Sequence, residues 1–301
     1  MDRTVVAGLD GSPESRAAVE WAAREAELRG LPLKIVHVWE PDPGPLDRAP
    51  MLGVETRAHW SERIPRESAA GLRARHPGLE ITAEHLPGRA YEILPKVALS
   101  AELLVLGSRA LGALGGFLVG SVGQSVIAHT EVPVVLVRAG HQAVDEHEAD
   151  PAGVPSAHTA FRPVLLGLDT GGQADDVTAF AFEEAARRGT RLRVLNAYNL
   201  PPYYVYGLAA DPTLHDEITR EQAAALTEAL ERWGKEYPSV EVVEESRPGS
   251  AGQLLADASR RASLVVVGRR VRHGRIGTHI GSVTHAVLHH ATAPVAVVAH
   301  P

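Results

Sequence analysis

Two halves of this 301-residue chain carry the same pattern of residues. The run from Val5 to Asp10 returns 159 positions later, as Val164 to Asp169, and the run from Leu104 to Gly107 returns 161 positions later, as Val265 to Gly268. Self-similarity at a fixed spacing is the signature of a duplicated structural unit. The small change in spacing falls in the middle of the repeat, where loops accept insertions at little cost. The chain is therefore expected to fold as two similar domains.

The domain boundaries follow from the repeat and from the composition between the copies. The segment 140–160 is polar, with four acidic residues between 145 and 150 and prolines at 151 and 155. This composition predicts a linker. We place the first domain at 1–139 and the second at 161–301.

Within each copy, short runs rich in valine, leucine and isoleucine alternate with longer helical patterns. The expected strands are 4–9, 33–38, 79–85, 102–107 and 133–137 in the first copy and 163–168, 191–197, 240–244, 263–268 and 294–298 in the second. The helices expected in the first copy are 13–29, 55–76, 89–100 and 121–130. Right-handed crossovers between parallel strands favour the strand order 3-2-1-4-5. The predicted fold class is α/β, with two tandem doubly wound, Rossmann-like domains, each a five-stranded parallel sheet flanked by helices.

The composition excludes several classes of protein. The formal net charge of -7 is spread along the chain, so no nucleic-acid partner is expected. The absence of cysteine excludes disulfides and thiolate catalysis. No apolar run approaches the roughly 20 residues of a membrane span, so we expect no membrane association and a cytoplasmic location.

A glycine-rich segment follows the fourth expected strand, at the edge where open α/β sheets bind ligands. It runs from Gly107 to Gly120-Ser121, at the start of a helix, and contains three further glycines. Glycine lets backbone N–H groups approach phosphate oxygens, and a helix start offers donors without helical acceptors. The Ser121 hydroxyl and the Arg109 guanidinium would add to such an anion cradle. The alternative is a surface turn with a serine cap, which the position in the sheet disfavours.

Asp10 ends the first expected strand at the same crevice. A carboxylate there would repel phosphate, but it could accept hydrogen bonds from ribose hydroxyls while the phosphates reach the loop after strand four. The alternative is that Asp10 helps to cap the following helix, beside Ser12 and Pro13. The sequence contains no P-loop with its lysine, and no Gly-x-Gly-x-x-Gly after the first strand, so other nucleotide-binding folds fit less well.

Together these features resemble the universal stress protein family, and the resemblance covers nearly all of both halves. Nucleotide-binding members have, after strand four, the pattern Gly, two residues, Gly, nine residues, Gly, then Ser or Thr. Here Ala110 replaces the second glycine. Its methyl group implies weakened binding if the backbone there is left-handed, at a cost of about 1 kcal/mol. In the second copy Val271 holds this position, which leaves open whether that site binds nucleotide or has become a packing surface.

The resemblance implies an adenine-nucleotide pocket in the first domain and an equivalent pocket in the second. The first set is Gly8, Asp10, Val38, Leu106, Gly107, Ser108, Arg109, Ala110, Gly120, Ser121 and Val122. The second set is Gly167, Asp169, Ala197, Gly268, Arg269, Arg270, Gly281, Ser282 and Val283. No residue in either set is expected to be catalytic or to bind a metal.

Other signals leave alternatives open. His285 and His289 share a helix face but lack a third ligand, so no metal site is expected. The tyrosine-rich segment 198–207 could stack on a base or cover a domain interface, and the proline-rich segment 39–53 could act as a lid.

The fifth strand of each copy is an apolar sheet edge, which favours association. The resemblance implies pairing through this strand, at 134–137 and 295–298. Such pairing would produce a pseudo-dimer within one chain, or a homo-oligomer.

The leading hypothesis is an ATP-binding, nucleotide-dependent regulatory or stress-response protein. ATP, alone or with Mg²⁺, is the expected cofactor. At most weak ATP hydrolysis is expected, because no evident general base or paired acidic metal ligands accompany the cradle. The alternatives are an interaction scaffold that dimerises and binds no nucleotide, and a nucleotidyl transferase.

Overall fold

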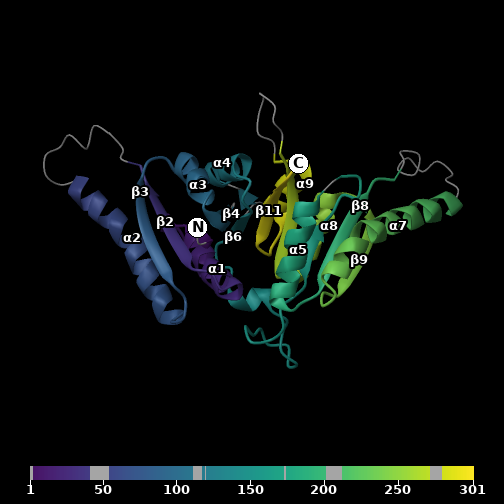
Figure 1. Cartoon of the computed structure of the whole chain (residues 1–301), viewed down its shortest axis with the longest axis horizontal. Coiled ribbons are helices and arrows are strands. Elements are labelled where there is room, and N and C mark those ends of the chain that lie inside the picture. Colours follow the sequence, from purple (N-terminus) through teal and green to yellow (C-terminus); the bar gives the residue numbers. More distant parts are fainter. Residues whose placement is uncertain are drawn as a thin grey trace. The chain divides into compact units, whose positions relative to one another are not determined.

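The computed structural model describes residues 3–40, 54–110, 117–118, 120–172, 174–200, 212–271 and 280–301. The chain divides into two compact units, Met1–Gln142 and Ala143–Pro301. Each unit has its own sheet with helices on both faces (Figure 1).

The first unit is a doubly wound α/β domain. Its elements are β1 (Thr4–Gly8), α1 (Pro13–Arg29), β2 (Leu33–Trp39), α2 (Val54–Arg75), β3 (Ile81–Pro87), α3 (Ala90–Ala98), β4 (Ala101–Ala110), β5 (Phe117–Leu118), α4 (Ser121–His129) and β6 (Val134–Arg138). Parallel pairing gives the order β3-β2-β1-β4-β6, which confirms the predicted 3-2-1-4-5 arrangement. The two-residue strand β5 was not predicted; it pairs antiparallel with the end of β4.

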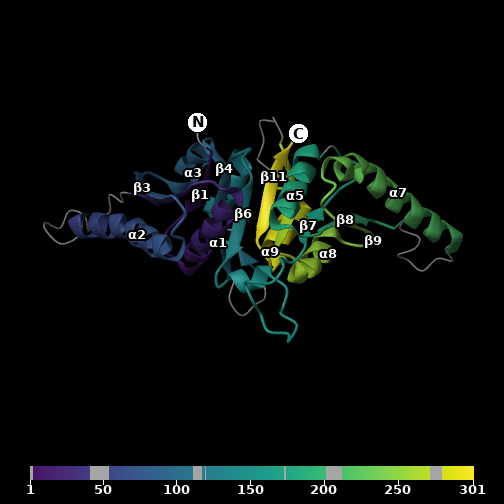
Figure 2. The same ribbon diagram turned by 60° about the horizontal axis from the view of Figure 1, so that its bottom comes forward.

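The second unit repeats this plan. Its elements are a 3₁₀ turn η2 (Ala143–Glu146), β7 (Val164–Gly167), α5 (Asp175–Arg188), β8 (Leu192–Tyr198), α7 (Pro212–Glu236), β9 (Val242–Pro248), α8 (Ala251–Ala258), η3 (Ser259–Arg261), β10 (Leu264–Arg270), α9 (Ser282–His290) and β11 (Val295–His300). The parallel order is β9-β8-β7-β10-β11. Figure 2 shows α5 and α7 on one face of this sheet and α8 and α9 on the other. Across the described ranges, no helix is long and apolar enough to cross a membrane.

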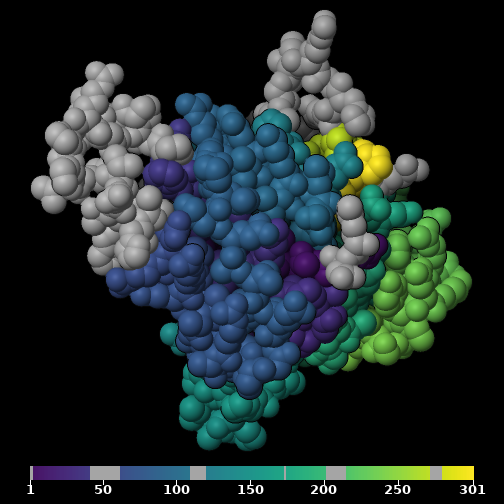
Figure 3. All heavy atoms as spheres, turned by 60° about the vertical axis from the view of Figure 1, so that its left-hand side comes forward, coloured from purple at the N-terminus to yellow at the C-terminus, as the bar shows by residue number. Residues whose placement is uncertain are grey.

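The central strands explain why the two sheets are covered on both faces. Val5, Val6 and Ala7 are all 0% exposed, although successive strand residues point to opposite faces. Such continuous apolar strands require helices on each side. In the view of Figure 3, the blue segment between α2 and α4 forms most of the visible surface of the first unit, and little of the purple segment that holds β1 and α1 is seen.

The third strand of each unit lies further along the chain than predicted. β3 occupies 81–87 instead of 79–85, and β9 occupies 242–248 instead of 240–244. A turn occupies the predicted start in both copies, because Leu79 donates its N–H to the His76 carbonyl and Val240 donates to the Tyr237 carbonyl. β3 and β9 are outer strands, and their surfaces are less covered than those of the central strands. They therefore include polar residues, which made the strand ends hard to locate from the sequence.

The segment after the unit boundary folds back on itself within the second unit. His147 and Phe161 form an antiparallel bridge, and Glu148 donates its N–H to the Ala160 carbonyl at 2.9 Å. The Thr190 hydroxyl donates to the Phe161 carbonyl at 2.8 Å. The guanidinium of Arg188 stacks over the Phe161 ring, 5.8 Å from its centroid. These contacts tie the segment to the end of α5 and the start of β8.

A polar pair lies on the face of the first sheet that α2 packs against. His37 of β2 and His85 of β3 are register partners, with Nδ1 atoms 3.1 Å apart and ring centroids 5.2 Å apart. A hydrogen bond between two Nδ1 atoms requires one protonated and one unprotonated nitrogen, which two neutral rings can supply. Burial and then the neighbouring His85 lower the pKa of His37, and Asp10 opposes this shift. The register partners at the same place in the second sheet are Asn196 and Ser246.

The first domain is therefore expected to lose stability on mild acidification. A histidine with a lowered pKa in the folded state binds its proton less readily than in the unfolded chain, where the pKa is about 6.5. Its contribution is full above that value and is lost as the pH falls through the lowered pKa. The variant His37→Asn/His85→Ser, which copies the second domain, should show a flatter dependence in urea unfolding measured between about pH 5 and pH 8. An unchanged dependence would assign the effect to other groups.

Candidate functional site

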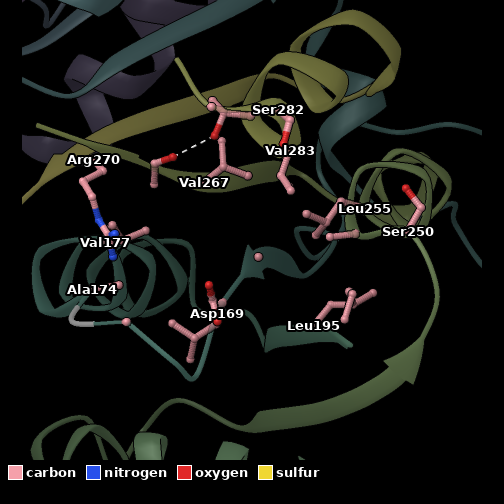
Figure 4. Close-up of a pocket in the computed structure, with 18 of the residues that line it drawn as sticks. Asp169, Ala174, Val177, Leu195, Ser250, Leu255, Val267, Arg270, Ser282 and Val283 are labelled. Atoms are coloured by element: carbon pink, nitrogen blue, oxygen red, sulfur yellow. Dashed lines mark hydrogen bonds between the residues drawn. The ribbon is translucent and has the colours of Figure 1, made fainter. Parts of the chain in front are cut away.

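A cavity of about 660 Å³ opens at the carboxyl ends of β7, β8 and β10 in the second unit. Figure 4 shows Asp169 at its centre, with Leu195, Leu255 and Ser250 on one side and Arg270 on the other. Its volume lies within the roughly 300–1,000 Å³ range of small-molecule sites. This is the crevice between the first and fourth strands, where the sheet order reverses.

One wall of this cavity is apolar, and we call it the apolar slot. Leu195 and Ala197 come from β8, Leu255 from α8 and Val267 from β10. The floor is Gly167, where an added Cβ would lie 2.7 Å from Leu255 Cδ1. A side chain at Gly167 would therefore displace the wall.

Asp169 follows β7 and faces the cavity. Its Oδ1 accepts the Gly171 N–H at 3.0 Å, and its carbonyl oxygen accepts the Gly172 N–H at 3.3 Å. The carboxylate is thus held by its own turn, as in an Asx-turn. A carboxylate has more acceptor sites than this one bond uses, so it can also accept bonds from ligand hydroxyls.

The start of α9 forms a polar wall of the same cavity. Gly281 begins the helix with φ 86° and ψ 145°, and no side chain caps it. The first helical bond joins the His285 N–H to the Gly281 carbonyl, so the amides of Ser282 and Val283 have no acceptor within the helix. Because φ is positive at Gly281, a residue with a Cβ would be strained there.

The first unit has a smaller cavity, of about 160 Å³, at the equivalent edge. Two glycines in its lining are closely packed. Leu106 reaches over the floor, so that a Cβ on Gly8 would lie 2.6 Å from Leu106 Cδ2. Gly107 packs directly on the first turn of α1, where its Cβ would lie 2.6 Å from the Glu14 carbonyl carbon.

From the sequence, Asp10 could either cap α1 or contact a ligand, and the structure shows how Asp10 and Ser12 divide these positions. Ser12 caps α1, since its Oγ accepts the Ser15 N–H at 3.1 Å. Asp10 Oδ1 accepts the Ser12 N–H at 2.9 Å, while its residue lines the cavity. The carboxylate therefore supports the turn before the helix and also faces the crevice.

The start of α4 differs from that of α9 in backbone conformation. Gly120 has φ −57° and ψ 156°, and an added Cβ would meet no atom of the described residues within 4 Å. Any residue could adopt this conformation. The Gln124 N–H bonds to the Gly120 carbonyl, so Ser121 and Val122 again present amides without helical acceptors.

Most residues expected from the sequence lie at these two cavities. In the first they are Gly8, Asp10, Val38, Leu106, Gly107, Gly120, Ser121 and Val122. In the second they are Gly167, Asp169, Ala197, Gly268, Arg270, Gly281, Ser282 and Val283. Ser108 and Arg269 are buried, at 3% and 5% exposed, and do not line the cavities as described. Arg109 and Ala110 lie in β4, and their side chains are outside the described part of the structure.

The wall supplied by α3 and α8 was not expected from the sequence. Ala90 and Leu94 line the first cavity, and Ala251 and Leu255 line the second. A signal was present, because Pro87-Gly88 and Pro248-Gly249 are 161 positions apart and precede these helices in both copies. Both glycines have φ 131°, a conformation that L-residues avoid.

Several expectations fall on residues outside the described ranges. These are the glycine-rich loop at 111–116, most of the proline-rich segment 39–53, and the tyrosine-rich segment from 201 onwards. His285 and His289 do lie within α9, with ring centroids 4.2 Å apart. Among the described residues, no group of three or more His, Asp or Glu side chains could hold a metal ion.

Comparisons with known proteins agree on one family. The family model described as the universal stress protein family matches residues 1–138 and 160–299. A universal stress protein of Mycolicibacterium smegmatis is 33% identical over 98% of this chain and 96% of its own length, and one from Mycobacterium tuberculosis H37Rv is 33% identical over 97% and 96%. The crystal structure of a universal stress protein from Archaeoglobus fulgidus has the same fold, with a TM-score of 0.70 at 18% identity, covering 99% of this chain and 98% of that one.

Proposed function

Because the chain belongs to the universal stress protein family, we propose that each domain binds an adenine nucleotide at the carboxyl edge of its sheet and that the bound nucleotide regulates the protein. The observation that carries this proposal is the second cavity. It combines an apolar slot, a central carboxylate and a helix start without a side-chain cap, within one space of about 660 Å³.

These three parts match the three parts of a nucleotide. The slot between Ala197 and Leu255 suits a purine ring. The Asp169 carboxylate suits the ribose hydroxyls, and the amides of Ser282 and Val283 suit the phosphates. Because the slot, the carboxylate and the helix start line one cavity, a single ligand can contact all of them.

The second cavity is better suited to a nucleotide than the first. From the sequence, Val271 left open whether the second domain binds nucleotide. The first cavity, at about 160 Å³, is small for a nucleotide. We therefore propose tighter binding in the second domain than in the first.

Slow turnover follows from the groups around the second cavity. Asp169 is the one carboxylate among its described lining residues, and its Oδ1 already holds the Gly171 amide. Activation of a water for in-line attack needs a base or metal ligands near the terminal phosphate. Mg²⁺ would then be carried mainly by the nucleotide phosphates.

The direct test is the nucleotide content of the purified chain, followed by calorimetric titration of nucleotide-free protein with ATP and Mg²⁺. Two sites per chain with different affinities are expected, and hydrolysis should be slow relative to binding. No bound nucleotide and no heat on titration would favour the interaction scaffold, whereas turnover that requires a second substrate would favour the transferase.

Asp169→Asn should weaken ATP binding at the second site about tenfold, because a hydrogen bond loses its charged acceptor. The matched ligand is 2′,3′-dideoxy-ATP, which lacks the hydroxyls and should bind both proteins alike. The measurement is calorimetry in a background that carries Gly120→Val, so that the second site is read alone. Equal weakening of both ligands would place the ribose elsewhere.

A further inference from the structure

Two polar residues of the second cavity, Asn199 and Ser250, lie on adjoining segments of the chain. Asn199 comes directly after β8, two residues beyond Ala197, and Ser250 comes directly before α8. The Gly249 N–H donates to the Tyr198 carbonyl at 3.0 Å, which joins the two segments. Both Asn199 and Ser250 line the cavity, and Figure 4 shows Ser250 on its α8 side. They therefore border the apolar slot, whose walls come from β8 and α8.

The side chains of Asn199 and Ser250 can both form hydrogen bonds with a ligand. Ser250 holds the N-cap position of α8 with an extended backbone, yet its hydroxyl makes no capping hydrogen bond. Serine is one of the residues that cap helices most often, so the free position of this hydroxyl is informative. Both residues are exposed. An asparagine amide offers an acceptor oxygen and an NH₂ donor side by side. The border of the slot is thus polar without being charged at these two residues.

The equivalent positions of the first unit have a different chemistry. At the spacings of the repeat, 159 and 161 positions, Asn199 corresponds to Glu40 and Ser250 to Arg89. There the Arg89 Nε donates to the Glu40 Oε1 at 2.8 Å, and the Arg89 Nη1 donates to the Tyr91 hydroxyl at 2.9 Å. An ion pair therefore occupies the place where the second domain has a neutral amide and a hydroxyl.

We propose that Asn199 makes the second domain selective for purine bases that carry a 6-amino group. This inference rests on the proposed function, which places a purine ring between Ala197 and Leu255. The Asn199 Oδ1 accepts a hydrogen bond from the amino group, and its Nδ2 donates to the neighbouring ring nitrogen. Asparagine pairs with adenine through two such bonds where proteins recognise DNA bases. A neutral amide suits a neutral base, because no charge has to leave water when the two meet.

The probes are ATP and purine riboside 5′-triphosphate, which differ only in the amino group of the base. Calorimetry uses the full chain with Gly120→Val, so that the second site is read. ATP should bind about ten times more tightly than the analogue, and Asn199→Ala should bind the two alike. Asn199→Asp keeps an acceptor oxygen for the amino group and should retain a preference for ATP.

The matched control is Gln253→Ala, which removes an exposed amide of α8 that is not among the described residues lining the cavity. It should leave the preference unchanged. Equal binding of both probes when Asn199 is present, or a preference that survives Asn199→Ala, would overturn the inference, while ATP binding itself would still support the proposed function. Failure of ATP to bind the unmodified chain would instead remove the proposed function.

Discussion

Replacing Glu184 with alanine is expected to lower the free energy of unfolding of the second domain by about 3–5 kcal/mol. The Arg188 guanidinium, 0% exposed, donates to the Glu184 carboxylate, 1% exposed, and Arg187 donates to the same carboxylate at 2.5 Å. Without the carboxylate, the buried Arg188 guanidinium would lose an ion-pair partner inside the protein. Hydrogen exchange measured across a urea series reports the free energy of unfolding of each domain separately and so tests this loss.

Two variants separate the buried charge from packing and from surface pairing. Glu184→Leu/Arg188→Met should recover much of the stability, because apolar residues can replace a buried ion pair at little net cost. Glu231→Ala removes a carboxylate whose pairing with Lys235 is exposed, and no measurable change is expected. A double variant as unstable as Glu184→Ala would show that the loss comes from packing.

The fold was accessible from the sequence because the pattern is repeated and the central strands of each unit are continuous apolar runs. Val5 to Ala7 and their equivalents are buried on both faces, so the alternation of strands and helices was unambiguous. The carboxyl-edge position of Asp10 and of Gly120 followed from the strand order alone. The edge strands β3 and β9 were misplaced by two to four residues because polar residues interrupt their pattern.

The difference in volume between the two cavities depends on features that are hard to predict from a sequence pattern. Ser12 and Pro13 are favourable residues for an early helix start, and Gly171-Gly172 are not, so the late start of α5 was partly visible in the sequence. The smaller volume of the first cavity was not visible in the sequence, because it depends on the rotamers of lining side chains such as Leu94 and Leu106. Rotamers of this kind are set by packing among residues distant in the chain.

Replacing Gly120 with valine is expected to abolish nucleotide binding in the first domain, with an increase in Kd of at least about a hundredfold, because several charge-assisted bonds to phosphate would be lost. The substitution suits the backbone, since φ is −57° and, within the part of the chain that the structure describes, a Cβ would meet no atom within 4 Å. The valine side chain would instead occupy the space through which phosphates reach the amides of α4. Calorimetry should show the stoichiometry falling from two ligands per chain to one.

The equivalent change at Gly281 shows why Gly120 is the informative position. Gly281 has φ 86°, so Gly281→Val would strain the start of α9 and could alter binding through the fold. Gly120→Val should instead leave hydrogen exchange in α4 and β4 unchanged. Loss of binding with unchanged exchange would then assign the phosphate position to the start of α4. If two ligands still bind per chain, the phosphates do not pass Gly120, and the first cavity must hold its ligand in another orientation.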